Sequence, residues 1–135
     1  MKTLAYYEAL PDSMTCWQLR DEFVEVLAAD PESNAELISA ALFALSERQW
    51  STYELVDEQL RADIAAMTLK LWNDHDGDLA EMLLGTTSRL GLGQVLRQLR
   101  EKDWSLYSVS VRKAVAEAIS EFGDTVDDPY SGIRS

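Results

Sequence analysis

The sequence has few of the residues that build covalent or metal-bound sites. Among its 135 residues it contains one cysteine, Cys16, and one histidine, His75. A single cysteine cannot form a disulfide within the chain and suits a reducing compartment, so we expect a cytoplasmic protein. A single histidine cannot supply the His and Cys ligands of a zinc site, and a general base would also need a nucleophile and an orienting partner. We therefore expect no catalytic residue, no metal and no cofactor.

Long apolar runs are also missing. No stretch approaches the roughly 20 apolar residues that cross a bilayer, and residues 1–8 lack the apolar region of a secretory signal. Apolar residues still make up 47% of the chain, enough for one continuous core at this length. We expect a single helical domain over 1–135, with an N-terminal arm (1–12), a helical core (13–123) and a C-terminal tail (124–135).

Positive charge is scarce and unevenly placed. The chain has 24 Asp and Glu against 12 Lys and Arg, a net charge of −12. Residues 1–78 hold 16 of the carboxylates and 5 of the basic side chains, whereas residues 79–123 are nearly balanced. Because nucleic-acid affinity depends on Lys and Arg, direct binding to DNA or RNA is not expected. The acidic surface either keeps the protein soluble or binds a basic partner.

Helix-start patterns recur along the chain. The spacing of a capping box occurs at Thr15-x-x-Gln18, Ser33-x-x-Glu36 and Ser51-x-x-Glu54, with a weaker version at Asp78-x-x-Glu81. Apolar residues follow at steps of three and four, and no long run alternates as a strand does. The fold class is therefore all-α, with helices expected near 15–29, 34–48, 52–72, 78–90, 92–102 and 106–122. Gly123 is expected to end the last of these helices in a left-handed conformation.

A short pattern, L-x-E-[RK]-x-W-S-x-Y, occurs at 45–53 and again at 99–107. Each copy is interpreted as the end of a helix, a tight turn with a tryptophan, and the start of the next helix. This predicts one helical hairpin used twice, with Trp50 and Trp104 in equivalent core positions. Hairpins of this kind bury their apolar faces by stacking, so we expect about six helices in stacked antiparallel hairpins, as a short solenoid or an irregular bundle.

Residues 110–119, Ser-Val-Arg-Lys-Ala-Val-Ala-Glu-Ala-Ile, resemble the V-R-x-x-A-x-x-A-[LI] signature of the inner helix of a HEAT-type repeat. The resemblance extends over about 34–122, but the Val-Arg pair is missing at 52–72. HEAT-like repeats are more often adaptors and binding scaffolds than enzymes. The resemblance therefore implies a concave surface for binding, without naming the ligand.

Three other features are candidates for chemistry. The string Asn73 to Asp78 resembles a calcium loop, but an EF-hand register places Trp72 and Leu83 where carboxylates are required. The pattern Gly91-Leu92-Gly93 lacks the third glycine of a dinucleotide-binding loop. Cys16 is expected on the apolar face of the first helix as a buried, unreactive thiol. We interpret all three as structural features.

The remaining candidates are carboxylates that helical spacing leaves off the apolar stripes. They are Glu22 and Glu25 on the first long helix and Glu54, Asp57, Glu58 and Asp63 on the third. Glu54, Asp57 and Glu58 are expected to crowd one helix face, which costs stability. We therefore predict that this face binds a basic protein.

The small, acidic, helical character of the chain is similar to that of bacterial toxin-immunity proteins. That similarity implies an inhibitor that neutralises a basic partner such as a toxin. The alternatives are a generic HEAT-like scaffold or adaptor, a DNA-mimicking inhibitor, and an enzyme with an unrecognised site.

Overall fold

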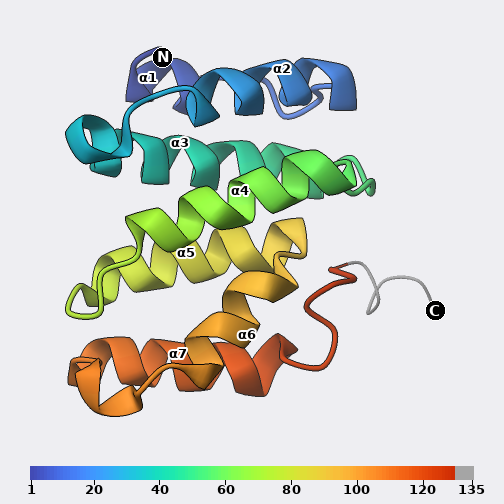
Figure 1. The fold of residues 1–135 in the computed structure, drawn as a ribbon. Coiled ribbons are helices and arrows are strands. Elements are labelled where there is room, and N and C mark those ends of the chain that lie inside the picture. Colours follow the sequence, from blue (N-terminus) through green and yellow to red (C-terminus); the bar gives the residue numbers. More distant parts are fainter. Residues whose placement is uncertain (130–135) are drawn as a thin grey trace.

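The computed structural model describes residues 1–129, which form seven α-helices, one 3-10 helix and no strand (Figure 1). The all-α prediction is confirmed. The part of the predicted tail at 130–135 lies outside the described residues. The bounds of the helices are α1 Leu4–Glu8, α2 Cys16–Leu27, α3 Pro31–Trp50, α4 Glu58–Leu71, α5 Gly77–Leu90, α6 Gly93–Glu101, η1 Trp104–Leu106 and α7 Val109–Phe122.

The helices alternate between two layers. In one layer α3 packs against α5, and α5 packs against α7, with α1 lying against the other side of α3. In the second layer α2 packs against α4, and α4 packs against α6. Consecutive helices therefore form stacked hairpins that follow one another down the molecule in Figure 1.

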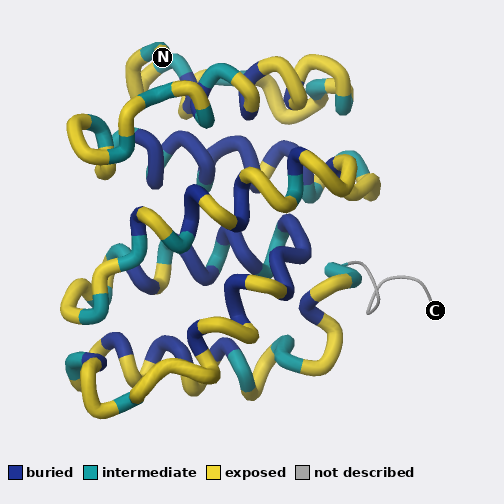
Figure 2. Tube along the Cα trace, viewed as in Figure 1, coloured by how far each residue is buried: buried dark blue, intermediate teal, exposed yellow. Residues whose placement is uncertain are grey.

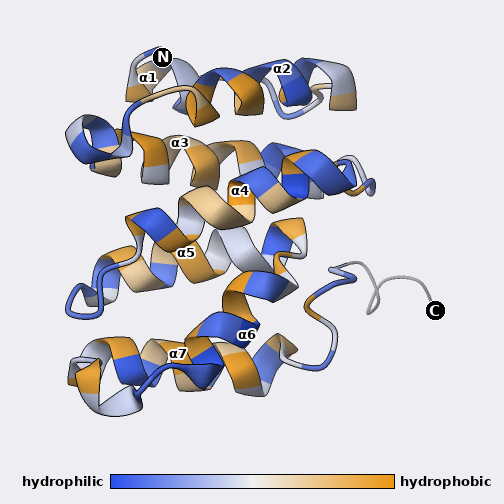
Figure 3. Cartoon of the chain, viewed as in Figure 1, coloured by the Kyte–Doolittle hydropathy of each residue, from blue (hydrophilic) through white to orange (hydrophobic). Residues whose placement is uncertain are grey.

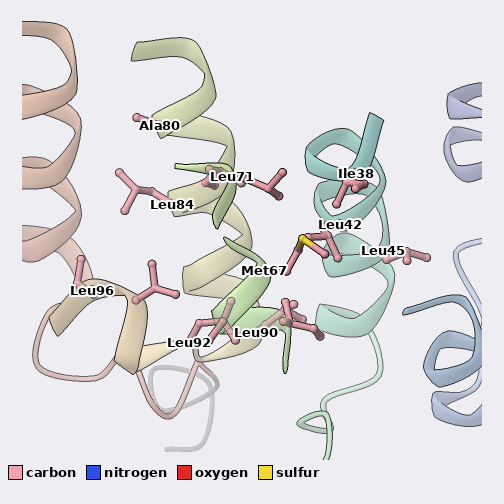
Figure 4. Packing of buried hydrophobic residues seen from close by; sticks show 14 of the residues in the cluster. Ile38, Leu42, Leu45, Met67, Leu71, Ala80, Leu84, Leu90, Leu92 and Leu96 are labelled. Atoms are coloured by element: carbon pink, nitrogen blue, oxygen red, sulfur yellow. The ribbon is translucent and has the colours of Figure 1, made fainter. Parts of the chain in front are cut away.

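The core lies between these layers and receives buried apolar side chains from each of the seven α-helices, while Trp104 of η1 packs against it. Figure 2 shows buried positions recurring along one side of each long helix, and Figure 3 shows apolar residues on the same sides. In Figure 4, Met67 of α4 lies beside Leu42 of α3, so the core passes directly from one layer to the other. Burial of such side chains contributes roughly 1.5–3 kcal/mol each, which makes this seam the main source of stability.

Only one of the predicted capping boxes is correct. Thr15 Oγ1 accepts a hydrogen bond of 3.2 Å from the backbone N–H of Gln18, and Gln18 Oε1 accepts one of 2.9 Å from Thr15 N–H. The box at Ser33 is wrong, because Asp30 caps α3 and Pro31 takes its first position, where no N–H is needed. The box at Asp78 is also displaced, since Asp76 caps α5.

The predicted start of α4 is wrong by several residues. Residues 54–57 are not helical, and Tyr53 has a positive φ of 58° that breaks the chain direction after α3. The first helical residue is Glu58, and Asp57 Oδ1 accepts a hydrogen bond of 2.9 Å from Leu60 N–H. The two possible caps, Ser51 and Asp57, lie six residues apart, and the packed structure uses Asp57.

The N-terminal arm is part of the domain. Residues 4–8 form α1, and Tyr7 is completely buried against the core. Arg48 of α3 donates hydrogen bonds of 3.0 and 2.9 Å to the carbonyl oxygens of Glu8 and Leu10. These bonds fix the chain that leaves α1, so the arm is held by both apolar and polar contacts.

The two copies of the predicted repeat are not equivalent. The first copy ends α3, whereas the second ends α6, and these helices belong to opposite layers. Trp50 is the last residue of α3, but Trp104 lies in η1, beyond the end of α6. The matching tyrosines differ more sharply, since Tyr53 is 61% exposed and Tyr107 only 3%. The shared pattern therefore marks two different turns.

The predicted left-handed glycine is also misplaced. Gly123 has a φ of −57°, whereas Gly91 has a φ of +68° and ends α5. The positive φ of Gly91 lets the chain turn between the end of α5 and the start of α6 at Gly93. A residue with a side chain would be strained at position 91.

Candidate functional site

A groove runs between α2 and α4 on the outside of the second layer. It consists of two cavities of about 400 and 270 Å³ that share Arg20 and Leu60 and are therefore contiguous. The larger cavity is lined mainly by apolar or small side chains: Val24, Leu27 and Ala28 from α2, and Ala66 and Met67 from α4. An apolar groove bordered by charged side chains is suited to binding another molecule.

Trp17 lies beside the smaller cavity and is 79% exposed. Leu55 lines the same cavity, and Val24, which is 50% exposed, lines the larger one. An exposed tryptophan beside other exposed apolar residues is unusual on a protein surface and is typical of a binding surface.

Two of the four tryptophans, Trp72 and Trp104, pack against the core. Trp17 is exposed, and the other three, Trp50, Trp72 and Trp104, are half-buried.

The sequence contained a signal for this surface that our reasoning missed. The buried residues of α2 include Leu19, Phe23 and Val26, which define its inner side. Trp17 and Val24 are seven residues apart, which is about two helical turns, so they share one face of α2, opposite its inner side. Two large apolar residues on an outer face mark a candidate docking stripe.

The predicted carboxylates near α4 do not crowd one helix face. Asp57 and Asp63 line the groove, Glu54 lies beside Cys16 at its smaller cavity, and Glu58 lines the neighbouring groove between α4 and α6. Glu54 precedes the helix, Asp57 caps it, Glu58 is its first residue, and Asp63 lies one turn further along. Asp57 forms an ion pair with Arg20 of α2, and Asp63 accepts a hydrogen bond from Gln59. Negative charge is favourable at a helix N-terminus, so the predicted cost of crowding is wrong at Asp57 and Glu58.

Glu22 and Glu25 lie away from the groove, near α1. The expectation that Glu22 faces solvent is wrong, since it is buried and accepts a hydrogen bond of 3.0 Å from the hydroxyl of Tyr6. Lys2 donates a hydrogen bond of 2.6 Å to Glu25, which raises the pKa of Lys2 and lowers that of Glu25. Both carboxylates attach the N-terminal residues to α2.

Cys16 is half-buried at the start of α2, so it is less enclosed than expected. Its thiol donates to the carboxylate of Glu54. Burial, and then the neighbouring Glu54 carboxylate, raise the pKa of the Cys16 thiol above its ordinary value. A raised pKa keeps the sulfur protonated at neutral pH, which does not suit a nucleophile.

The loop 73–76 has a structural role. Asn73 Oδ1 accepts a hydrogen bond of 2.9 Å from His75 N–H, Asp76 caps α5, and His75 is exposed. Asp74 accepts hydrogen bonds of 2.9 Å from the indole N–H of Trp72 and 2.8 Å from the ammonium group of Lys102. Within residues 1–129, no group of three or more His, Cys, Asp and Glu side chains is placed to hold a metal ion.

The glycines at 91 and 93 pack against the chain beyond α7. The carbonyl oxygens of Val126 and Asp127 approach Gly91, and the Asp127 side chain lies over Gly93. Asp127 also forms an ion pair of 3.0 Å with Arg97 of α6. These glycines therefore allow a close approach of backbone, as expected of structural glycines.

None of the helices described in residues 1–129 combines the length and the apolar character needed to cross a membrane. Comparison with protein-family models, curated proteins and solved structures finds no match to this chain.

Proposed function

We propose that this chain is an acidic protein-binding module that binds a basic partner through the groove between α2 and α4. The observation that carries the proposal is the 79% exposure of Trp17 beside a contiguous apolar groove. Tryptophan is among the residues that contribute most to protein interfaces, especially next to a pocket that a partner can fill.

The charge supports a basic partner. The net charge of the chain is −12, Asp57 and Asp63 line the groove, and Glu54 lies beside Cys16 at its smaller cavity. A long-range acidic field accelerates the approach of a basic protein, and the apolar groove then supplies affinity. The most concrete form of this function is an immunity or inhibitor protein that neutralises a basic partner, such as a toxin, by covering its working surface.

A scaffold or adaptor is the second candidate function, favoured by the stacked helical hairpins. The two functions differ in stoichiometry. An inhibitor holds one partner and abolishes its activity, whereas an adaptor binds two different partners at once.

The test is affinity capture from a lysate of the source organism, followed by mass spectrometry. The wild-type protein is compared with Trp17→Ala and with Leu106→Ala, whose side chain is 54% exposed in η1. We expect wild type and Leu106→Ala to retain the same basic protein, and Trp17→Ala to lose it. Equal capture by all three proteins would contradict the proposal.

A further inference from the structure

Two exposed apolar residues along the groove are spaced by two turns of α2. Trp17 borders the smaller cavity and Val24 the larger one, and they are separated by seven residues of α2. Seven helical residues rise about 10.5 Å, or two turns. Apolar side chains at positions i and i+7 of a bound helix have the same separation, and one at i+4 falls between them.

We propose that the groove binds a single amphipathic helix of the partner, with apolar anchors at i and i+7 and lysine or arginine beside the anchor nearest Trp17. This inference rests on the proposed function, because it identifies the part of the basic partner that enters the groove.

The charges give the bound helix a direction. The ion pair between Arg20 and Asp57 joins the first turns of α2 and α4, while Leu27 and Lys70 line the groove near their last turns. The two helices therefore run the same way. The Trp17 end carries Asp57, which Arg20 pairs, and Glu54, whose carboxylate lies beside Cys16, whereas Lys70 lies at the other end. The basic end of the ligand is thus expected beside Trp17.

A helical ligand fits better than an extended one. An extended segment gains affinity by adding its backbone to a sheet edge, and residues 1–129 contain no strand. A helix satisfies its own backbone hydrogen bonds and needs only a groove for its apolar side chains.

The neighbouring groove between α4 and α6 shows why α2 and α4 form the open site. Residues beyond α7 lie against that second groove, where Arg61 donates to the carbonyl oxygen of Asp127 and Arg97 pairs with its carboxylate. Val126 in this segment is only 5% exposed. The chain itself therefore covers part of the α4 and α6 groove, and no described segment covers the α2 and α4 groove in the same way.

The test uses three synthetic peptides of about 18 residues. The first is an amphipathic helix with leucines at i, i+4 and i+7 and lysines around the first leucine. The second replaces the lysines with glutamates, and the third keeps the lysines but carries two central prolines that prevent helix formation. The protein is labelled with 5-fluorotryptophan, which gives one ¹⁹F signal for each of its four tryptophans. Trp17→Phe identifies the signal of residue 17.

We expect the lysine peptide to shift the Trp17 signal and leave the signals of Trp72 and Trp104 in place. We expect it to bind about tenfold more tightly than the glutamate peptide, with the difference shrinking at high salt. The proline peptide should not bind. Equal binding of the helical and proline peptides, or a shift at another tryptophan instead of Trp17, would overturn the proposal.

Two matched pairs of variants test the site without disturbing the core. Ala66→Trp fills the larger cavity from an exposed position and should abolish peptide binding, whereas Ala116→Trp, exposed on α7, should not. Glu54→Lys, beside Cys16 at the smaller cavity, should weaken binding of the lysine peptide about tenfold, whereas Glu121→Lys on α7 should leave it unchanged. Equal effects within either pair would count against the groove.

The outcomes separate this inference from the proposed function. If partner capture still depends on Trp17 but no helical peptide binds, the protein-binding function stands and the helical ligand is wrong. If neither Trp17→Ala nor Ala66→Trp affects capture, the proposed function itself is wrong. If sedimentation shows a dimer that Ala66→Trp disrupts, a second copy of this chain fills the groove and the proposal is overturned.

Discussion

Lys102 donates a hydrogen bond of 2.8 Å from its ammonium group to Asp74 Oδ1, which joins the end of α6 to the loop between α4 and α5. The same oxygen accepts a hydrogen bond of 2.9 Å from the indole of Trp72, and the Asp74 carbonyl oxygen accepts one of 2.9 Å from Ser108 N–H. The loop that most resembled a metal site in the sequence thus connects the end of α4, the end of α6 and the start of α7.

Asp74→Ala should lower the free energy of unfolding by about 1–3 kcal/mol at neutral pH, because it leaves the Trp72 indole without its acceptor and Lys102 without its partner. Asp74→Asn is the matched control. It can still accept from Trp72, so it should cost less. Urea denaturation of the three proteins measures the difference.

The same pair predicts a pH dependence. The hydrogen bond from Lys102 lowers the pKa of Asp74 below its ordinary value of 3.8. A carboxyl group whose pKa is lowered by folding stabilises the fold at pH values above its ordinary pKa. This stabilisation is lost as the pH falls through the lowered pKa of the folded state. The difference in free energy of unfolding between wild type and Asp74→Ala should therefore become smaller from pH 5 to pH 3. A gap that stays constant over this range would show that the charge of Asp74 contributes nothing.

The sequence predicted the fold well where local chemistry decides it. The periodic apolar residues placed six of the seven helices, and the reciprocal hydrogen bonds of Thr15 and Gln18 fixed the start of α2 correctly. It failed where two caps competed. Ser51 and Asp57 both carry cap-forming oxygens, and only the packed structure, in which Asp57 pairs with Arg20, distinguishes them.

The candidate site was predicted only in part. Asp57 and Asp63 line the groove and Glu54 lies beside it, since acidic residues off the apolar stripe tend to lie on the surface, whereas Glu58 lines the neighbouring groove. Glu22 is buried instead, because α1, a helix that the sequence did not predict, covers it and supplies the hydroxyl of Tyr6 as a hydrogen-bond donor. The groove itself depends on α2 and α4 lying side by side, a long-range relationship that periodicity along one helix does not contain.

Charge reversal at Asp57 should destabilise the protein, contrary to the expectation from sequence. Asp57→Lys removes the N-cap of α4 and repels Arg20, so it should cost about 1–2 kcal/mol. Asp57→Asn keeps a cap oxygen and serves as the control, with a cost of a few tenths of a kcal/mol. Thermal denaturation at low salt measures both. A Tm for Asp57→Lys equal to that of wild type would contradict the role of this cap.

Cys16 should react slowly with iodoacetamide at pH 8. Burial and the neighbouring Glu54 carboxylate raise the pKa of its thiol, so little of the reactive thiolate is present. Glu54→Gln removes the negative charge, lowers the thiol pKa and should speed the reaction. In concentrated urea the two proteins should react alike, because the folded contact is gone. An unchanged folded-state rate in Glu54→Gln would show that access alone limits Cys16.

Tyr7→Ala should be the most destabilising single substitution in α1. The Tyr7 side chain is completely buried, and α1 packs directly on α3. Truncation of a buried aromatic side chain costs roughly 3–5 kcal/mol, since it removes apolar contacts and leaves a cavity. Leu4→Ala on the same helix is the control, because Leu4 is 37% exposed and should cost only about 0.5 kcal/mol.

Equilibrium unfolding in urea distinguishes a docked α1 from a loosely attached arm. If α1 is part of the cooperative unit, Tyr7→Ala lowers the midpoint and leaves the slope of the transition unchanged, because the same surface is exposed on unfolding. Arg48 favours this outcome, since its hydrogen bonds to the Glu8 and Leu10 carbonyl oxygens hold the chain just beyond α1. If Tyr7→Ala lowered the free energy of unfolding by less than about 1 kcal/mol, α1 would instead separate from α3 without unfolding the domain.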